Sequence, residues 1–306
     1  MTLGTRWQQM ARRAARAAMS PMPPSLVLAA IERGAPRLAQ LGLRTGYRGF
    51  PRYLRRFPDR LAPFFGTALG RIDERARLIE ARLSFILVRA LVHQMLAAQS
   101  PADAARRLGP IEMRGEDHLE AARAEGRGVI LASAHFGLPA VIRLAIEARG
   151  VPVVGIGGRA NRVEVTLGRD VWTNTRGLTR MREELAAGHV CIILLDVRRG
   201  RYSELPFLGG RMPVTVGAFR IAQMTGSPLL PAFGIMTGGT PRFRVDVGPP
   251  LAIPDRRSTA PFTEATTTFI HEFEDLGRRY PAQLFGYEPV FVPSGTRAPA
   301  AGRPPS

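Results

Sequence analysis

The stretch "GVILASAHFGLPAVIRLAIEARGVPVVGI" at residues 128–156 decides the fold of this chain. Its first part, 128–134, is a short apolar run of the kind found in buried strands. A helical pattern follows, with Pro139 near its first turn and Gly150 as its stop. A second apolar strand comes at 151–156. Strands that alternate with helices of about a dozen residues indicate an α/β fold.

The same alternation continues toward the C-terminus, while the N-terminal part is predicted to be mainly helical. Downstream helices are expected at 179–188, 214–226 and 262–280, with strands at 189–197 and a strand pair at 227–248. Upstream helices are expected at 25–43, 55–69 and 71–98. We therefore predict a helical segment at 1–125 and an α/β core at 126–292, a central mixed β-sheet flanked by helices. The tail at 293–306, rich in Pro, Gly, Ala and Arg, is predicted to be disordered.

The charge of the chain is strongly positive. It has 43 basic residues, all of them arginine, against 25 acidic residues, a formal net charge of +18. A G- and C-rich genome accounts for arginine in place of lysine but not for the excess over acids. That excess predicts an anionic partner: nucleic acid, anionic lipid headgroups or an acidic carrier protein. Nucleic acid is disfavoured, because no known nucleic-acid module is visible and few aromatic residues lie among the arginines.

Membrane contact is predicted at the N-terminal end. On a helical projection of residues 5–19, Trp7 and Met10 share one face with alanines, while four arginines occupy the others. That pattern is typical of a helix that lies in a membrane interface, and an amphipathic helix docked on the domain is the alternative. A membrane-spanning helix is not expected, because the best candidate, 83–92, is interrupted by Arg89 and is shorter than the ~20 residues that a span requires.

Three polar residues follow predicted strands at the points where these strands end. They are His135, Arg159 and Asp196. In α/β folds, ligands bind beyond the carboxyl ends of the strands, so three such residues indicate a site. His135 would also face the positive end of the helix that follows, which favours a neutral imidazole able to act as a general base. Free N–H groups at the same helix start are expected to receive an oxyanion.

Other kinds of site are not indicated. Cys191 is the single cysteine, lies in the apolar run "VCIILLDV" and is expected in the core. The segment "GIGGR" (155–159) does not open a helix as a dinucleotide-binding G-x-G-x-x-G does. No metal-ligand spacing is present, so neither a metal nor a cofactor is expected.

Two segments together carry a resemblance to a known family. "GVILASAHFG" (128–137) and "ILLDVRRGRYSELPFLGGRMPVTVGAFRIAQMTGSPLLPAFG" (193–234) resemble the bacterial lipid A late acyltransferases, within the lysophospholipid and glycerolipid acyltransferase superfamily. The resemblance implies an acyltransferase-like α/β fold whose cleft opens toward the membrane. It also implies that His135 activates the acceptor hydroxyl and that Arg159 binds a substrate phosphate. Asp196 resembles the acid that, in the family, ends the next strand of the sheet.

The chain departs from the family pattern at two places. The family carries an H-x4-D/E motif whose acid orients the histidine, and the acid position here is Ala140. A closing Pro-Glu-Gln-Trp-like stretch is replaced by "PAQLFGYEPVF" (281–291). Three explanations are open. Asp196 or Glu204 orients His135 instead, the histidine works slowly alone, or the chain is a lipid-binding protein without activity.

The predicted function is acyl transfer from an acyl-carrier-protein or coenzyme A thioester to a hydroxyl of a glycolipid or phospholipid. The predicted catalytic residues are His135 and Asp196, and the predicted substrate-binding residues are Gly137, Arg159, Arg198 and Arg199. The planar guanidinium groups of the arginine-rich segment 198–201 can each bind two phosphate oxygens at once. An acidic acyl carrier protein suits the positive charge. The expected location is peripheral, on the cytoplasmic face of the inner membrane.

Overall fold

The computed structural model describes residues 24–44, 56–59, 61, 72–98, 101–155, 175–197, 201–238, 242–284 and 292–293. The predicted interfacial helix at 5–19, Arg159, Arg198 and Arg199 lie outside the described residues, as does the tail from 294 onward. Most of the helix expected at 55–69 lies outside them as well.

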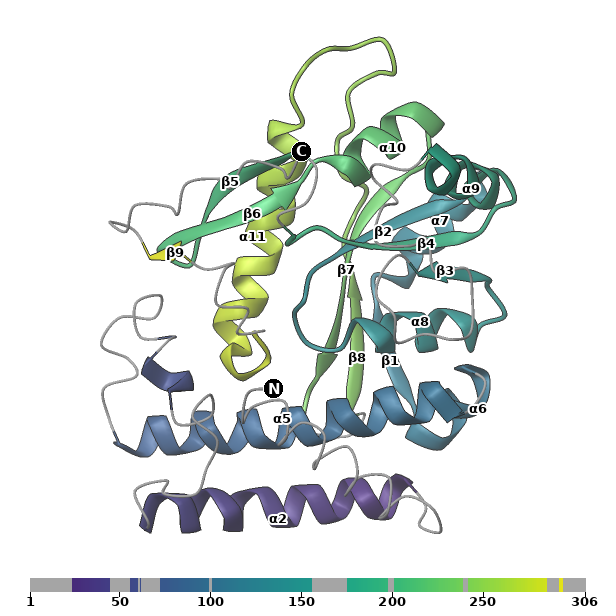
Figure 1. Ribbon diagram of the computed structural model, residues 1–306. Helices are drawn as coiled ribbons and strands as arrows, with labels where there is room; N and C mark the ends of the chain where they lie inside the picture. The colour runs from purple at the N-terminus through teal and green to yellow at the C-terminus, as the bar shows by residue number, and fades with distance from the viewer. Residues whose placement is uncertain are drawn as a thin grey trace.

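A mixed sheet of six strands forms the centre of the protein, which confirms the predicted fold class (Figure 1). Its strands are β1 (Ile111–Arg114), β8 (Phe243–Val247), β7 (Leu229–Met236), β2 (Val129–Ser133), β4 (Val190–Leu194) and β3 (Val153–Gly155), in that spatial order. The strands β7, β2, β4 and β3 run parallel. The strand β8 runs antiparallel to β7, and β1 runs parallel to β8.

Helices cover both faces of this sheet. One face packs against α7 (Glu116–Ala124) and α8 (Pro139–Glu147), and the other against α9 (Thr175–Ala186), α10 (Gly217–Thr225) and α11 (Thr263–Arg279). The central strand β2 serves both faces: Ile130 and Ala132 join one apolar cluster, and Val129 and Leu131 join the other. All five residues of β2 are buried, as the unbroken apolar run predicted.

The N-terminal helices form a separate layer at one end of the sheet. The helices α2 (Pro24–Arg44) and α5 (Ile72–Ala98) lie side by side across the ends of β7 and β8 (Figure 1), and the short helix α6 (Pro101–Leu108) continues toward β1. Leu26, Leu38 and Leu41 of α2 are exposed, although they are large and apolar. Among the described residues, no helix has both the length and the apolar character needed to cross a membrane.

The edge strand of the main sheet and a second, smaller sheet differ from the sequence-based expectation. Residues 111–114, placed in the mainly helical segment, form the edge strand β1, whose four residues are half-buried or exposed. A small antiparallel sheet of β5 (Tyr202–Phe207), β6 (Gly210–Thr215) and β9 (Val292–Pro293) was also not predicted. Its strands contain Pro206 and Pro213, and proline weakens the strand pattern in a sequence.

Candidate functional site

The register of β2 and β4 brings His135 and Asp196 to the same edge of the sheet. The two strands are parallel neighbours, and Ser133 at the end of β2 is aligned with Leu194 at the end of β4. His135 and Asp196 each lie two residues further along their own chain segment. Equal steps from aligned residues therefore place the two side chains together, although 61 residues separate them in the sequence.

The Asp196 carboxylate contacts both the ring and the backbone of His135. His135 Nδ1 lies 2.9 Å from Asp196 Oδ1. The backbone N–H of His135 donates to both carboxylate oxygens, at 2.9 Å and 2.8 Å. The side chain of Asp196 is 6% exposed and that of His135 is 31% exposed. The carboxylate is thus nearly buried and held by charge-assisted hydrogen bonds, while the imidazole ring is partly exposed.

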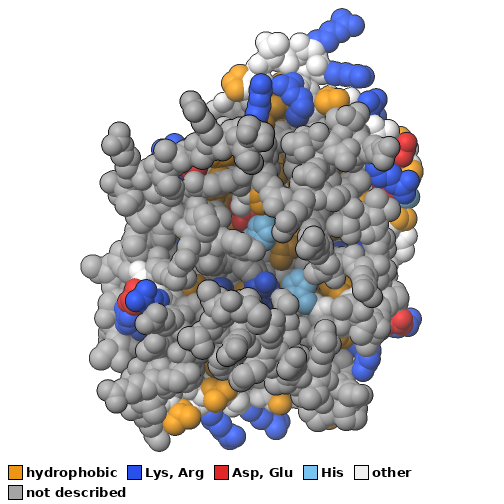
Figure 2. Space-filling model, in the orientation of Figure 1, with side chains coloured by type: hydrophobic (Ala, Val, Ile, Leu, Met, Phe, Trp, Pro, Cys, Tyr) orange, Lys and Arg blue, Asp and Glu red, His pale blue; other side chains and the backbone are white. Residues whose placement is uncertain are grey.

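This contact determines which ring nitrogen can act as a base. An ionised carboxylate only accepts hydrogen bonds, so it favours the tautomer that carries the proton on Nδ1. The lone pair of the neutral ring is then on Nε2, the nitrogen on the other side of the ring. Figure 2 shows histidine side chains on the face in view, one of them beside an acidic side chain.

Backbone hydrogen bonds fix the segment that carries Asp196. The N–H of Leu195 donates to Ser133 O at 2.8 Å, which extends the pairing of β2 and β4 past the last strand residue. The carbonyl of Leu195 accepts from Thr215 N at 2.8 Å and from Val197 N at 2.9 Å. Asp196 therefore leaves the sheet from a point that is tied to both β2 and β6.

The residues that follow β2, 134–138, form the turn that we call the histidine loop. Its Phe136 is fully buried and packs edge-on against Phe273, with 5.5 Å between ring centroids. Gly137 has a φ of 56°, and a Cβ there would lie 2.1 Å from Gly234 O. Only glycine fits this position, because the backbone of β7 approaches it so closely. The predicted role of Gly137 in substrate binding stays a prediction.

The expectation of a free oxyanion site at this turn is wrong for two of its N–H groups. The N–H of Gly137 donates to Gln283 O at 3.1 Å, and the N–H of Leu138 donates to Gly234 O at 2.7 Å. The helix α8 then begins with Pro139, which has no N–H. These groups hold the histidine loop against the neighbouring chain instead of facing a ligand.

Glu204, the other candidate acid, lies on β5, the motif position Ala140 lies on α8, and Cys191 lies on β4. Glu204 lies on β5 in the small sheet, where its carbonyl accepts from Arg211. Ala140 packs against the apolar cluster on the α8 face of the main sheet. Cys191 is buried in β4, and burial raises the pKa of its thiol to about 12, with a further increase from the negative charge of Glu184. Cys191 is therefore a core residue, as predicted, and not a nucleophile.

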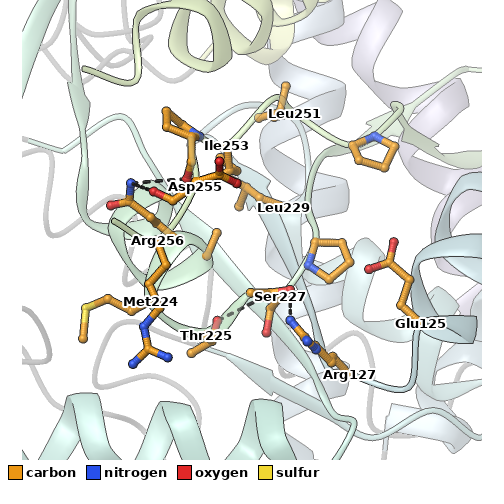
Figure 3. A pocket seen from close by; sticks show the side chains of 16 residues that line it. Glu125, Arg127, Met224, Thr225, Ser227, Leu229, Leu251, Ile253, Asp255 and Arg256 are labelled. Atoms are coloured by element: carbon orange, nitrogen blue, oxygen red, sulfur yellow. Dashed lines mark hydrogen bonds between the residues drawn. The ribbon is translucent and has the colours of Figure 1, made fainter. Parts of the chain in front are cut away.

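Two cavities lie at opposite ends of the parallel strands. One, of about 580 Å³, lies between α2, α5, the end of β7 and the short 3₁₀ helix η2 (Pro281–Gln283). Its apolar lining consists of Ile31, Leu78, Ala81, Val88, Met236, Pro281 and Ala282. The other, of about 530 Å³, lies at the amino ends of β2 and β7, where Arg127 donates to Gly226 O at 3.0 Å (Figure 3). The wall of the first contains Gln283, whose backbone carbonyl accepts from Gly137 of the histidine loop.

An α/β sheet that presents a histidine paired with a buried carboxylate at its carboxyl edge is typical of enzymes that activate a hydroxyl group. The family model for bacterial lipid A biosynthesis acyltransferases matches residues 61–283, most of the chain. The chain therefore belongs to this acyltransferase family, and the resemblance stated from the sequence is confirmed.

The matches to individual proteins are weaker than the match to the family model. Among solved structures, the chain is similar to the 1-acyl-sn-glycerophosphate acyltransferase PlsC from Thermotoga maritima, with 16% sequence identity and a TM-score of 0.35. That match covers 73% of this chain and 94% of the other. No curated protein matches the chain.

Proposed function

We propose that this protein transfers a fatty acyl chain from an acyl-carrier-protein or coenzyme A thioester to a hydroxyl of a glycolipid or phospholipid. The family membership indicates an acyltransferase that acts on lipid. The single observation that supports a working site is the contact of His135 Nδ1 with Asp196 at 2.9 Å, which supplies a carboxylate that Ala140 lacks.

The proposed reaction uses His135 twice. Its Nε2 takes the proton of the acceptor hydroxyl while the hydroxyl oxygen attacks the thioester carbonyl. The tetrahedral intermediate then breaks its C–S bond, and the departing thiolate takes the proton back from the imidazolium. The Asp196 carboxylate stabilises the imidazolium during this interval and keeps the ring in the productive tautomer. The products are an ester and a free thiol, so protons and electrons balance.

The cavity beside η2 is proposed to take the hydrocarbon chain of a substrate. Its volume of about 580 Å³ lies within the usual range for small-molecule sites, and its lining is mainly apolar. Arg77 and Arg279 line this cavity together with Glu32, Glu74 and Glu80, so binding of phosphate or carrier stays assigned to the predicted residues Arg159, Arg198 and Arg199. The exposed leucines of α2 support contact with a membrane surface, in addition to the contact predicted for helix 5–19. In this proposal the surface is the cytoplasmic face of the inner membrane.

The alternative is a lipid-binding protein of the same fold without activity, which the loss of the motif acid at Ala140 favours. An acyl-transfer assay on the full chain separates the two. Radiolabelled acyl-carrier-protein and coenzyme A thioesters are offered with a membrane lipid extract, and ester formation is followed for the parent and for His135→Ala. We expect turnover by the parent and a loss of at least about a hundredfold in the variant. Lipid binding without turnover by either protein would support the alternative.

A further inference from the structure

Gln283 is a buried glutamine that holds the end of β7. It is 4% exposed and is the last residue of η2, which follows α11. Its side chain pairs with both backbone groups of Met236: Nε2 donates to Met236 O at 2.6 Å, and Oε1 accepts from Met236 N at 3.0 Å. The amide thus acts as a short strand partner for the last residue of β7.

The backbone of Gln283 extends the same contact to the histidine loop. Its carbonyl accepts the N–H of Gly137 at 3.1 Å. The next residue, Leu284, forms a β-bridge with Phe136. These contacts join the end of β7 to the two residues that directly follow His135. The imidazole direction depends on the backbone of this loop, so Gln283 lies in a position to control it.

A buried arginine holds η2 from the opposite side. Arg82 of α5 is 6% exposed, and its Nη1 donates to Ala282 O and to Leu284 O, both at 2.8 Å. Its guanidinium also lies over the Phe57 ring, 4.4 Å from the centroid. The residues on both sides of Gln283 are therefore fixed by the N-terminal helical layer. Burial of a charged group in this place indicates that the geometry of η2 is closely specified.

We propose that Gln283 is a positioning residue for the His135–Asp196 pair, a role that rests on the proposed function of His135. Through Met236 and Gly137, Gln283 keeps the histidine loop at one distance from β7, so that the His135 ring stays against Asp196. A residue that only joined η2 to β7 would contribute to stability and leave turnover per folded molecule unchanged.

The chain offers a matched control at the opposite end of the sheet. Gln223 of α10 is also 4% exposed, and its amide donates to the carbonyls of Pro254, Asp255 and Ser258 at 3.2, 3.0 and 3.2 Å. Loss of either side chain removes several hydrogen bonds to backbone groups and leaves a cavity where a buried amide lay, so both alanine variants are expected to lose stability. Only the contacts of Gln283 reach the histidine loop.

The test compares Gln283→Ala with Gln223→Ala in the full chain, at a temperature where circular dichroism shows both variants folded. Hydrogen exchange is measured for a peptide that covers 129–141, together with kcat and KM for acyl transfer. Gln283→Ala should speed exchange at Gly137 and lower kcat by about ten- to a hundredfold, because small misplacements of a catalytic group have effects of this size. Gln223→Ala should change neither. Equal effects of the two substitutions, or no effect of Gln283→Ala, would overturn the proposal.

A conservative variant covers the case in which Gln283→Ala does not fold. In Gln283→Glu, only the protonated carboxyl can donate to Met236 O while it accepts from Met236 N. The activity of this variant relative to the parent should therefore rise as the pH falls, and a ratio that does not change with pH contradicts the role. Failure of the proposed function is recognised separately: it appears as full activity in His135→Ala, whereas the exchange measurement reports on the histidine loop without any reaction.

Discussion

Asp196→Asn tests the histidine–carboxylate pair with the smallest change in shape. In the parent, Asp196 accepts from the N–H of His135 and from Nδ1 of its ring. An asparagine has one oxygen and one NH₂ group, and in the parent Oδ1 contacts both donors whereas Oδ2 contacts only the backbone N–H. If the asparagine oxygen takes the Oδ2 position and keeps the backbone N–H, its NH₂ faces Nδ1 and favours the tautomer with the proton on Nε2. The ring then has no lone pair to offer the acceptor hydroxyl.

The expected loss follows from this change of tautomer. The corresponding substitution in a serine protease lowers kcat about 10⁴-fold, and general base catalysis as a whole contributes about 10²–10⁴-fold. Because the His135 side chain is 31% exposed, water can support part of the ring that the carboxylate no longer holds. We therefore expect a fall in kcat of about 10²–10⁴, or roughly 3–5.5 kcal/mol in activation free energy.

The assay is single-turnover acyl transfer, which reports on the chemical step alone. Asp246→Asn is the control, since it removes a partly buried carboxylate that pairs with Arg244 on the same sheet, on the far side of β7 from β2. This control should keep kcat within about twofold. The double variant of His135→Ala and Asp196→Asn should be no slower than His135→Ala alone, because residues that act as a unit are not additive. If the losses in rate of the two single variants multiply in the double variant, the two residues act independently and the pairing is refuted.

Three further predictions concern pH, the motif position and the membrane. Burial raises the pKa of Glu272 to about 7 from an ordinary 4.5, despite a smaller lowering by His118. The stability that its protonated form contributes is therefore lost as the pH rises from 4.5 through 7. Glu272→Gln should raise the free energy of unfolding at pH 8 by roughly 1–2 kcal/mol, measured by urea titration, and should give no gain at pH 4. Ala140→Glu should not increase acyl transfer, because Nδ1 of His135 already faces Asp196 and Ala140 packs on an apolar cluster. If this variant is faster than the parent in the transfer assay, Asp196 is an inadequate partner for His135. Deletion of residues 1–20 should move much of the protein into the soluble fraction on membrane pelleting, and undiminished pelleting would place the membrane contact elsewhere.

The parts of the fold that were predicted are those with a regular pattern in the sequence. Unbroken apolar runs identify β2 and β4, because strands covered on both faces need apolar side chains throughout. The edge strand β1 has no such run, since only part of its surface is covered. Gln283 was missed for a different reason. Its partners are 47 and 146 residues away, and a single buried amide leaves no periodic signal in the sequence.

The contact between His135 and Asp196 was accessible from the sequence because it depends on strand register. An acid at the Ala140 position would be presented by the first turn of α8, whereas Asp196 is presented by β4, whose pairing with β2 is set by five aligned residues. Side chains alternate between the faces of a sheet, so a slip of β4 by one residue would exchange the side chains that pack in the two core clusters. The packing of Cys191 and Ile193 on one face and of Val190 and Ile192 on the other opposes such a slip. The forces that hold the core together therefore also hold the carboxylate beside the imidazole, and the site keeps its histidine–acid pair without the acid of the family motif.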